Sequence, residues 1–390
     1  MPIFVVVFAV IFLALYVLKQ RNDHLQVVQF TQPDLVFHVQ KSKVPPFQNR
    51  RTVLVTGGNG FLGSHAVSLL MDKYNVIVMD LVVPRRCHPS VTYVQGNLLN
   101  MDHILAALEV LGHDIQVDAV LHLASLLPAL DVPEGAMTRI NVDGTQHLLH
   151  ACQDKNVTAF IYTSDATIAL GREPMHVRQV NEDMSFSTDE SLDTYTQTKT
   201  IAERLVLASH CADPAQPTTT AVKVPLATCA LRPTSMMVRV DKDARVRGKY
   251  TLDSNGTTLV LRDYVSVVDV AQAHVLAMEA LLTPQGRARI GGQAYFIGSD
   301  SETPRRHSDA QPSSSVRVLY WLAFLNHAVF ELTGQILLHK HVTAANVDAS
   351  QRTYTFSSAK AKRDLGYAPT AMGWFEAAIS RPRQEDAAMS

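Results

Sequence analysis

The stretch VTGGNGFLG, residues 55–63, decides the fold of this chain. Gly57, Gly60 and Gly63 have the spacing G-x-x-G-x-x-G, directly after an apolar strand and before a helix. In that setting one glycine permits a tight turn, one lets the backbone approach a pyrophosphate, and one lets the helix pack closely on the strand. The amino end of the helix then faces the phosphate charge. The motif predicts a dinucleotide-binding fold.

Apolar strands and helical segments alternate around this motif. The expected strands are TVLVTG, NVIVMD, VTYVQG, VDAVLHLAS and AFIYTS, and the expected helices are residues 61–73, 102–111 and 140–152. Val- and Ile-rich strands separated by helices are typical of a parallel sheet with helices on both faces. We therefore predict an α/β fold, a doubly wound parallel sheet of the Rossmann type with a smaller C-terminal substrate region.

Composition narrows the function classes. The chain has 390 residues, a net charge of −1 and 47% hydrophobic residues, enough for a sizeable core. A charge near zero gives no reason to expect nucleic acid as a partner. The four cysteines are scattered with no C-x-x-C pair, so we expect reduced thiols and no metal site.

The N-terminus carries an unbroken apolar run, IFVVVFAVIFLALYVL, from Ile3 to Leu18. As a helix it would cover roughly 24 Å, slightly less than the ~30 Å hydrocarbon core of a bilayer. No basic residue precedes it and no A-x-A site follows, while Lys19 and Arg21 come directly after it, which keeps the rest of the chain in the cytosol. We predict an N-terminal membrane helix over residues 1–20; a cleaved or core segment is the alternative.

The rest of the chain divides into three parts. A polar linker is expected over 21–50, an NAD(P)-binding Rossmann domain with the catalytic residues over 51–235, and a substrate-side region over 236–390. In the last part, a segment near 258–300 is expected to complete the Rossmann domain. Residues 316–338 are apolar but interrupted by polar side chains, which predicts an amphipathic helix on the domain or membrane surface. A packing helix is the alternative.

Asp80 bears on the choice of cofactor. It ends the second strand, 23 residues after Gly57. A carboxylate there binds the ribose hydroxyls and repels a 2′-phosphate, so the sequence favours NAD. Arg85 and Arg86 follow closely, and one of them could serve the 2′-phosphate of NADP instead.

Two further strand ends carry candidate cofactor contacts. Asn97, next to Leu98 after the third strand, is either an adenine contact or a turn residue. His122 and Ala124 end the fourth strand at the carboxyl edge of the sheet, where dinucleotides bind. His122 is either a packed strand-end histidine or a neighbour of the cofactor.

Tyr195 and Lys199, in TYTQTK, stand four residues apart and so share one face of a helix. A lysine cation beside a tyrosine lowers the phenol pKa because it favours the phenolate. Such a tyrosine can exchange a proton with a substrate hydroxyl or carbonyl while a nicotinamide exchanges hydride. The pair lies roughly 135 residues after the glycine motif, which strengthens an otherwise common pattern.

These motifs resemble those of the extended short-chain dehydrogenase/reductase superfamily. Within it they resemble the 3β-hydroxysteroid dehydrogenase family, and most closely the sterol-4α-carboxylate 3-dehydrogenases (decarboxylating). The matching stretches span residues 52–370 and are VTGGNGFLGSH, VLHLAS, NVDGTQHLLHAC, FIYTS, LDTYTQTKTIAE, ALRP, RDYVSVVDVAQAHVLAMEAL and FSSAKAKRDLGYAP. The resemblance implies oxidation of a 3β-hydroxyl on a sterol-like substrate with NAD(P) at the endoplasmic reticulum membrane. It also raises the expectation of a homodimer or of sterol-processing partner enzymes.

The resemblance assigns roles to residues of this chain. Tyr195 would be the general acid/base, and Lys199 would lower its pKa and bind the nicotinamide ribose. Pro233, in LRPTSM, would border the nicotinamide, with Thr234 and Ser235 on the site side or in an ordinary turn. The candidate cofactor-binding residues are Gly57, Gly60, Phe61, Leu62, Gly63, Asp80, Asn97, Leu98, Ala124, Tyr195, Lys199 and Pro233.

Asp165 departs from the family pattern, which has a serine there that hydrogen-bonds the substrate oxygen. A carboxylate cannot donate a hydrogen bond unless it is protonated, and it raises the pKa of a neighbouring tyrosine. We expect Thr167 or Ser164 to replace the serine as a catalytic donor, and prefer Thr167 because alternate residues after a strand face the same way. The alternatives are a weakly active or non-catalytic protein, or an active Asp165 that is protonated.

The segment after Pro233 is shorter than in the family, so the substrate lid looks shortened. We predict oxidation of the 3β-hydroxyl of a sterol or triterpenoid to the 3-ketone. A 4α-carboxylate, where present, could then leave as carbon dioxide from the β-keto acid. The alternatives are a reductase of another polycyclic or flavonoid-like ketone, and a catalytically weak NAD(P)-binding scaffold in a membrane sterol-processing complex.

Overall fold

The computed structural model describes most of the chain between residues 31 and 370. The gaps are residues 33, 113, 130, 171–176, 185–192, 212–224, 238–262, 300–313, 334–336, 339–342 and 344–353. The membrane helix predicted over 1–20 lies outside the described residues. Within the described part, no helix is both long enough and apolar enough to cross a membrane.

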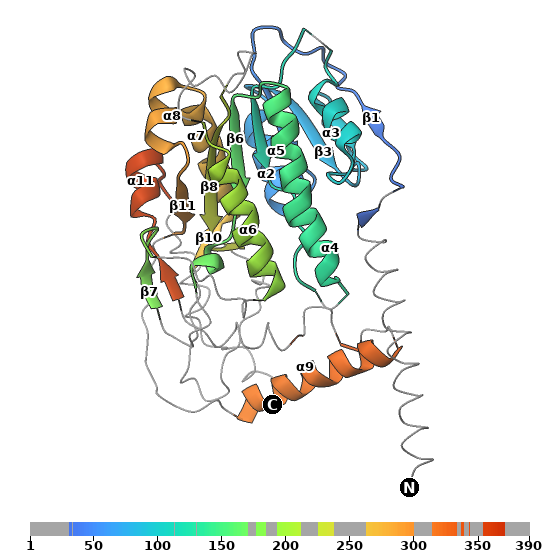
Figure 1. Ribbon diagram of the computed structural model, residues 1–390, viewed down its shortest axis with the longest axis vertical. Helices are drawn as coiled ribbons and strands as arrows, with labels where there is room; N and C mark the ends of the chain where they lie inside the picture. Colours follow the sequence, from blue (N-terminus) through green and yellow to red (C-terminus); the bar gives the residue numbers. More distant parts are fainter. Residues whose placement is uncertain are drawn as a thin grey trace, which may run out of the picture.

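A single large sheet forms the centre of the molecule, with the strand order β1-β4-β3-β2-β5-β6-β8-β11 (Figure 1). The strands are β1 His38–Gln40, β2 Thr52–Thr56, β3 Asn75–Asp80, β4 Val91–Gln95, β5 Ala119–His122, β6 Ala159–Thr163, β8 Ala227–Pro233 and β11 Ala294–Ile297. All neighbours pair in parallel except β1, which runs antiparallel to β4. The order reverses between β2 and β5, the place where doubly wound sheets bind ligands.

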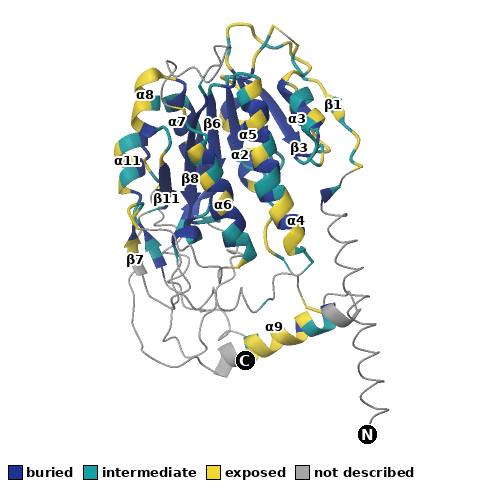
Figure 2. Cartoon of the chain, viewed as in Figure 1, coloured by how far each residue is buried: buried dark blue, intermediate teal, exposed yellow. Residues whose placement is uncertain are grey.

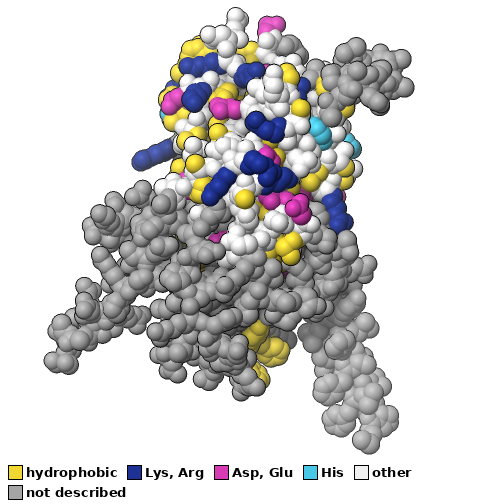
Figure 3. All heavy atoms as spheres, turned by 90° about the vertical axis from the view of Figure 1, so that its left-hand side faces the viewer, with side chains coloured by type: hydrophobic (Ala, Val, Ile, Leu, Met, Phe, Trp, Pro, Cys, Tyr) yellow, Lys and Arg dark blue, Asp and Glu magenta, His cyan; other side chains and the backbone are white. Residues whose placement is uncertain are grey.

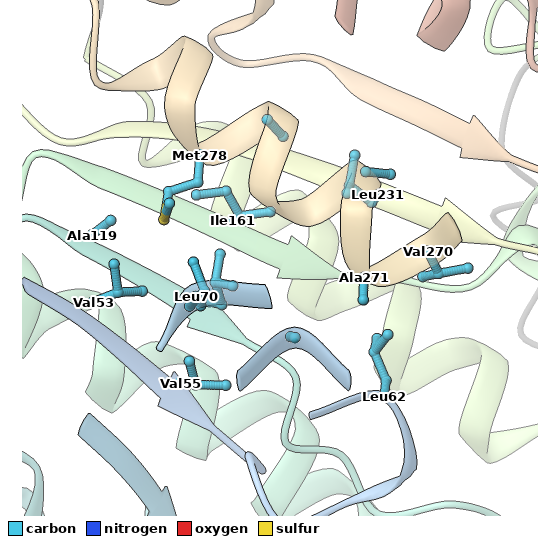
Figure 4. Close-up of a cluster of buried hydrophobic side chains, with 14 of the residues drawn as sticks. Val53, Val55, Leu62, Leu70, Ala119, Ile161, Leu231, Val270, Ala271 and Met278 are labelled. Carbon is cyan, nitrogen blue, oxygen red and sulfur yellow. The ribbon is translucent and has the colours of Figure 1, made fainter. Parts of the chain in front are cut away.

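Helices cover both faces of this sheet, as predicted for a doubly wound fold. One face carries α2 Phe61–Leu70, α7 Val267–Leu281, α8 Pro284–Ile290 and α11 Ala359–Leu365, and the other carries α3 Met101–Leu108, α5 Gly144–Asp154 and α6 Thr194–Ala208. Successive residues of β2 point to opposite faces: Val53 and Val55 pack under α2 and α7, and Leu54 packs under α3 and α5. Figure 4 shows the first of these clusters, and Figure 2 shows that the strands are buried while the outer helix surfaces are exposed.

Two segments differ in detail from the sequence prediction. The segment 21–50, predicted as a linker, contributes the edge strand β1. Strands β8 and β11, which were not recognised as strands, extend the sheet beyond β6. The segment predicted to complete the Rossmann domain near 258–300 includes α7 and β11, which belong to the central sheet and its helical cover.

Smaller elements lie beside the carboxyl edge of the sheet. They are the parallel pairs β9 Ser235–Met237 with β10 Tyr264–Ser266, and β7 Val177–Val180 with β12 Tyr354–Phe356. A helix, α9 Ser314–Thr333, lies apart from the sheet near the lower end of Figure 1, in the segment where an amphipathic helix is predicted. Its Trp321 and Phe324 side chains are 71% and 63% exposed, whereas Ala323 and Asn326 are buried.

The surface around α8 and α11 carries both signs of charge. Figure 3 shows Lys and Arg side chains interspersed with Asp and Glu on this face. The mixture agrees with the net charge of −1, and it gives this face no single-sign field that would attract a polyanion.

A buried ion pair joins α6 to β8. The Arg232 guanidinium donates to both carboxylate oxygens of Glu203, with Nη2 at 2.7 Å from Oε1 and Nε at 3.0 Å from Oε2. Both side chains are almost fully buried, and the guanidinium also lies over the ring of Phe296. A desolvated pair of this kind is tolerated only with good geometry. It fixes the helix that carries Tyr195 and Lys199 against the strand that ends at Pro233.

We expect Arg232→Met to lower the free energy of unfolding by roughly 3–5 kcal/mol, because it leaves the Glu203 carboxylate buried without its partner. The double variant Arg232→Met/Glu203→Met should regain most of that loss, since two apolar side chains replace the pair. Chemical denaturation of the wild type and both variants measures the difference. Equal losses in the single and double variants would contradict this account.

Candidate active site

The glycine turn after β2 is a site of very close backbone approach. Gly57 has φ +68°, a conformation that favours glycine, and its N–H donates to the Met79 carbonyl at 2.8 Å. A β-carbon on Gly63 would lie 2.1 Å from the Gly57 carbonyl oxygen and 2.6 Å from the Gly58 Cα. Helix α2 can therefore begin directly on the turn only because no side chain stands there.

The residues present at this turn fit a dinucleotide. Helix α2 begins after Gly60 without a hydrogen bond from a capping side chain, so the amide groups of its first turn have no side-chain acceptor there and suit a phosphate. Phe61 is half-exposed and Leu62 is buried in that first turn. When bound, NAD(P) would supply a hydride acceptor. Gly57, Gly60 and Gly63 would hold its pyrophosphate.

Asp80 lies at the carboxyl end of β3, beside the glycine turn. Its carboxylate accepts the Asn59 N–H at 3.1 Å and the Val82 N–H at 3.4 Å. Burial raises the pKa of the carboxyl group, and the backbone N–H groups oppose that rise. A partly buried carboxylate next to the phosphate turn is placed as a ribose contact requires.

Asn97 and Leu98 are held within the protein. The Asn97 side chain is buried and donates to the carbonyls of Thr31 and Gln32 at 2.5 and 2.8 Å, while its Oδ1 accepts the Leu99 N–H at 2.9 Å. These bonds match the turn interpretation of Asn97 better than an adenine contact, because both of its amide hydrogens have acceptors. Leu98 is buried against the start of α5.

His122 is a packed strand-end histidine. Its Nδ1 and Nε2 lie 2.7 and 2.9 Å from the hydroxyl oxygens of Thr56 and Thr145. Burial lowers the pKa of the ring to about 3, with the Lys199 cation adding to the effect, so the imidazole is neutral. Ala124, by contrast, does border the glycine turn: a β-carbon on Gly57 would lie 2.7 Å from its Cα.

Tyr195 lies in the first turn of α6, and its hydroxyl donates to Asp165 Oδ2 at 3.2 Å. The helix begins at Asp193, whose carboxylate accepts the Thr196 N–H at 3.0 Å and so caps the helix. Lys199, one turn later, donates to the Thr163 carbonyl at 2.7 Å and is almost fully buried. The structure thus brings Tyr195 and Lys199 to the carboxyl end of β6.

The electrostatics of this pair differ from the sequence expectation. The pKa of Tyr195 is raised well above its usual value, first by burial and next by the charge of Asp165. Burial lowers the pKa of Lys199 to about 8, and Asp165 and Glu203 oppose that change. The low Tyr195 pKa expected beside Lys199 is therefore not seen in this structure, where burial and Asp165 outweigh any effect of the lysine. The ammonium is directed to the Thr163 carbonyl and to the ring of Tyr162 instead.

Asp165 occupies the position between Tyr195 and Thr167. Its Oδ1 accepts the Thr167 N–H at 2.8 Å and the Thr167 hydroxyl at 2.6 Å, so it caps a short 3₁₀ turn, Ala166–Ala169. A threonine hydroxyl has one hydrogen, and this one is directed to Asp165. The expectation that Thr167 donates to the substrate oxygen is therefore not supported.

Ser164 and Thr234 place two buried hydroxyl groups at the ends of adjacent strands. Strand β6 pairs with β8, and the Ser164 N–H donates to the Leu231 carbonyl at 2.7 Å. Neither Ser164 Oγ nor Thr234 Oγ1 has a hydrogen-bond partner among the described residues. A buried hydroxyl without a partner is costly, so a polar ligand group is expected there. Pro233, the buried last residue of β8, precedes Thr234, and this edge fits the nicotinamide end of NAD(P).

Asn141 is a residue of the site that sequence reasoning did not single out. It lies in a π-helical turn, Arg139–Asp143, and is buried. Its amide donates to the Leu126 carbonyl at 3.0 Å and to the Thr198 hydroxyl at 3.1 Å. It thus ties α6 to the loop after β5. The residue spacing does not predict a π-helical turn. The sequence could have pointed to Asn141 only through its place in the family-like stretch NVDGTQHLLHAC.

We expect Gly63→Ala to weaken NADH binding by about 100-fold or more, because the added methyl group cannot fit against the Gly57 carbonyl without moving α2 off the turn. Ser64→Ala is the matched control, since Ser64 is the exposed neighbour on the same helix. Fluorescence titration with NADH measures both. Equal affinities in the two variants would contradict the assignment of this turn to the cofactor.

Comparison with known proteins identifies the family of the chain. A model of the 3-beta hydroxysteroid dehydrogenase/isomerase family matches residues 54–311. The chain is 31% identical over 335 residues to a 3 beta-hydroxysteroid dehydrogenase/Delta 5→4-isomerase of Mycobacterium tuberculosis, covering 81% of this chain and 86% of the relative. It is 28% identical over 363 residues to short-chain dehydrogenase/reductase family 42E member 1 of Macaca fascicularis, covering 85% and 89%.

Solved structures share the fold. UDP-glucose 4-epimerase of Thermotoga maritima, solved with UDP-glucose, has a TM-score of 0.56 at 19% identity and covers 84% of this chain and 97% of that chain. MoeE5, solved with UDP-glucuronic acid and NAD, has a TM-score of 0.54 at 25% identity and covers 85% and 97%. These comparisons support the broad family rather than the narrower sterol-4α-carboxylate group. The chain therefore belongs to the 3-beta hydroxysteroid dehydrogenase/isomerase family of oxidoreductases.

Proposed function

We propose that the protein oxidises the 3β-hydroxyl of a sterol or triterpenoid to the 3-ketone, with NAD(P) as the hydride acceptor. The observation that carries the proposal is the Tyr195 hydroxyl at the carboxyl edge of the sheet, hydrogen-bonded to the Asp165 carboxylate. The glycine turn that suits a pyrophosphate lies at the same edge. A tyrosine in this position can exchange a proton with a substrate oxygen beside a bound nicotinamide. Family membership supports a steroid-like substrate.

We propose NAD as the preferred cofactor. The Asp80 carboxylate is held by backbone N–H groups of Asn59 and Val82 beside the glycine turn, where it would meet the adenosine ribose. A 2′-phosphate there would face a negative charge. Neither Arg85 nor Arg86 has a contact with Asp80 in the described residues that would neutralise it.

A 4α-carboxylated sterol is the narrower substrate proposal. Oxidation of its 3-hydroxyl would give a β-keto acid, which can lose carbon dioxide because the ketone accepts the electrons of the breaking bond. The loss of carbon dioxide needs no further catalytic residue, so it depends only on whether the substrate carries a 4α-carboxylate. The resemblance of residues 52–370 to the decarboxylating group supports it.

Membrane attachment at the endoplasmic reticulum, with the catalytic domain in the cytosol, is part of the proposal. The apolar run Ile3–Leu18 followed by Lys19 and Arg21 supports an anchor. The exposed Trp321 side chain on α9 supports a second contact, because aromatic side chains favour the membrane interface.

Tyr195→Phe is expected to lower kcat/KM for a 3β-hydroxysterol by roughly 10²–10⁴-fold, since the phenyl ring cannot exchange a proton. NADH formation by the detergent-solubilised full chain, with 3β-hydroxysterols that carry or lack a 4α-carboxylate, measures it. Tyr74→Phe is the matched control, because the Tyr74 hydroxyl contacts Glu279 at 2.8 Å, away from the site. Tight NAD binding without turnover of any sterol would favour the scaffold alternative, and turnover only of ketones with NADH would favour the reductase.

Asp80→Asn is expected to shift the ratio of NADP to NAD affinity by about tenfold towards NADP, or ~1.4 kcal/mol. The amide keeps an oxygen that can accept the Asn59 N–H but removes the charge that repels a 2′-phosphate. Titration with NADH and NADPH measures the ratio, with Asp72→Asn as a control that removes an exposed carboxylate elsewhere. An unchanged ratio in Asp80→Asn would show that this carboxylate does not select the cofactor.

A further inference from the structure

Tyr195 cannot begin the reaction as a phenolate in this structure. Burial and the neighbouring Asp165 charge raise the pKa of its hydroxyl well above the usual value. Lys199, the residue that would favour a phenolate, donates to the Thr163 carbonyl at 2.7 Å. The hydroxyl therefore carries its proton at neutral pH. A tyrosine that is to accept a proton from an alcohol must first, or at the same time, give its own proton to another group.

The group that receives this hydrogen bond is Asp165. The Tyr195 hydroxyl donates to Asp165 Oδ2 at 3.2 Å, which is long for such a bond, as is common before substrate binds. The other carboxylate oxygen, Oδ1, is held by the N–H and the hydroxyl of Thr167 at 2.8 and 2.6 Å. Asp165 is thus aimed at Tyr195 by a fixed turn and left with one oxygen for the tyrosine.

We propose that Asp165 takes up, through the hydroxyl of Tyr195, the proton that an alcohol substrate loses on oxidation. This inference rests on the proposed dehydrogenase function. The substrate O–H proton passes to the Tyr195 oxygen as Tyr195 gives its own proton to Asp165 Oδ2. The hydrogen on the carbon that bears this hydroxyl is transferred as a hydride to the oxidised nicotinamide. The alcohol becomes a ketone, the dinucleotide is reduced, and Asp165 becomes a neutral carboxylic acid that later loses its proton to water.

The same geometry favours an alcohol over a ketone as the bound ligand. Because the Tyr195 hydrogen is directed to Asp165, the tyrosine oxygen presents lone pairs to the substrate. An alcohol can donate to those lone pairs, and a ketone cannot. The serine that the family pattern has in place of Asp165 would instead offer a donor to a ketone oxygen. The substitution therefore tunes this site for the oxidative direction at neutral pH.

The charged and titratable groups around the pair set its pH dependence. Among the described residues, the groups that interact electrostatically with Tyr195 or Lys199 are Asp165, Tyr162, Asp193, Glu203 and the neutral His122, and Glu203 is paired with Arg232. From α7, His274 reaches the Thr163 hydroxyl, and burial lowers its pKa to about 4, so it is neutral. Because the pKa of Lys199 is lowered to about 8, its ammonium is present below that pH and is lost above it. Activity is expected to fall above pH ~8.

The decisive variant is Asp165→Asn. Asparagine also caps helical turns and has an oxygen for Thr167, so the fold is kept, but its amide cannot take up a proton. We expect kcat/KM for a 3β-hydroxysterol to fall by about 100-fold or more at pH 7, because Tyr195 then has no carboxylate to receive its proton. In mixtures of light and heavy water, the rate should depend on two transferred protons in the wild type and on one in the variant.

Thr167 is a positioning residue in this scheme. Thr167→Val removes the hydroxyl that holds Asp165 Oδ1 and should lower kcat/KM by about tenfold without moving KM, while Thr167→Ser should restore it. Asp72→Asn, which removes an exposed carboxylate outside the site, should leave both constants unchanged. Wild-type kinetics in Asp165→Asn, or an unchanged two-proton dependence, would overturn the proposal.

A readout that needs neither cofactor nor turnover separates this inference from the proposed function. The chain has 11 tyrosines, so the phenolate absorbance of Tyr195 is obtained as the difference between a protein and its Tyr195→Phe counterpart. We expect this phenolate at a lower pH in Asp165→Asn than in the wild type. The same pH in both would overturn the coupling even if sterols turn over. The expected shift without turnover of any sterol would support the coupling and overturn the substrate assignment.

Discussion

Close backbone approach at the glycine turn is the constraint on which the rest of the structure depends. A β-carbon on Gly63 would lie 2.1 Å from the Gly57 oxygen, so a single turn can connect β2 to α2 only if Gly63 has no side chain. This short connection places the amino end of α2 at the carboxyl edge of the sheet. Parallel pairing of β2 with β3 and β5 then brings Asp80 and Ala124 to the same edge. The part of the site proposed to bind the pyrophosphate is thus formed by backbone, and Asp80 and Ala124 border it.

The catalytic end depends on a desolvated ion pair. Tyr195, Lys199 and Glu203 follow one another at four-residue spacing on one face of α6. Because Glu203 is held by Arg232 of β8, the other two side chains are directed to the end of β6. Asn141 also holds the helix, through the Thr198 hydroxyl. A site positioned by buried contacts on rigid elements keeps its geometry without help from loops.

Asp165 gives the site an electrostatic character that a serine at this position would not. A serine at this place would add a neutral donor, whereas the carboxylate adds a charge and an acceptor. Burial first and then this carboxylate raise the pKa of Tyr195, and the carboxylate accepts the tyrosine's hydrogen bond. The buried Lys199 ammonium donates to the Thr163 carbonyl and lies within the electrostatic reach of the Asp165 and Glu203 carboxylates. The substitution therefore alters which proton moves and where it goes, while tyrosine and lysine keep their places.

The sequence by itself determined the α/β architecture, the glycine turn and the pairing of Tyr195 with Lys199, because strand and helix periods and glycine sterics are local properties of the chain. Tertiary structure alone decided which partner each polar side chain takes. Thr167 was predicted to face the substrate and binds Asp165 instead, and Asn97 binds the segment before β1 rather than an open site. Both outcomes depend on distances and angles that only the folded backbone sets: the 3₁₀ turn after β6 brings Thr167 to Asp165, and packing of the segment before β1 brings its carbonyls to Asn97.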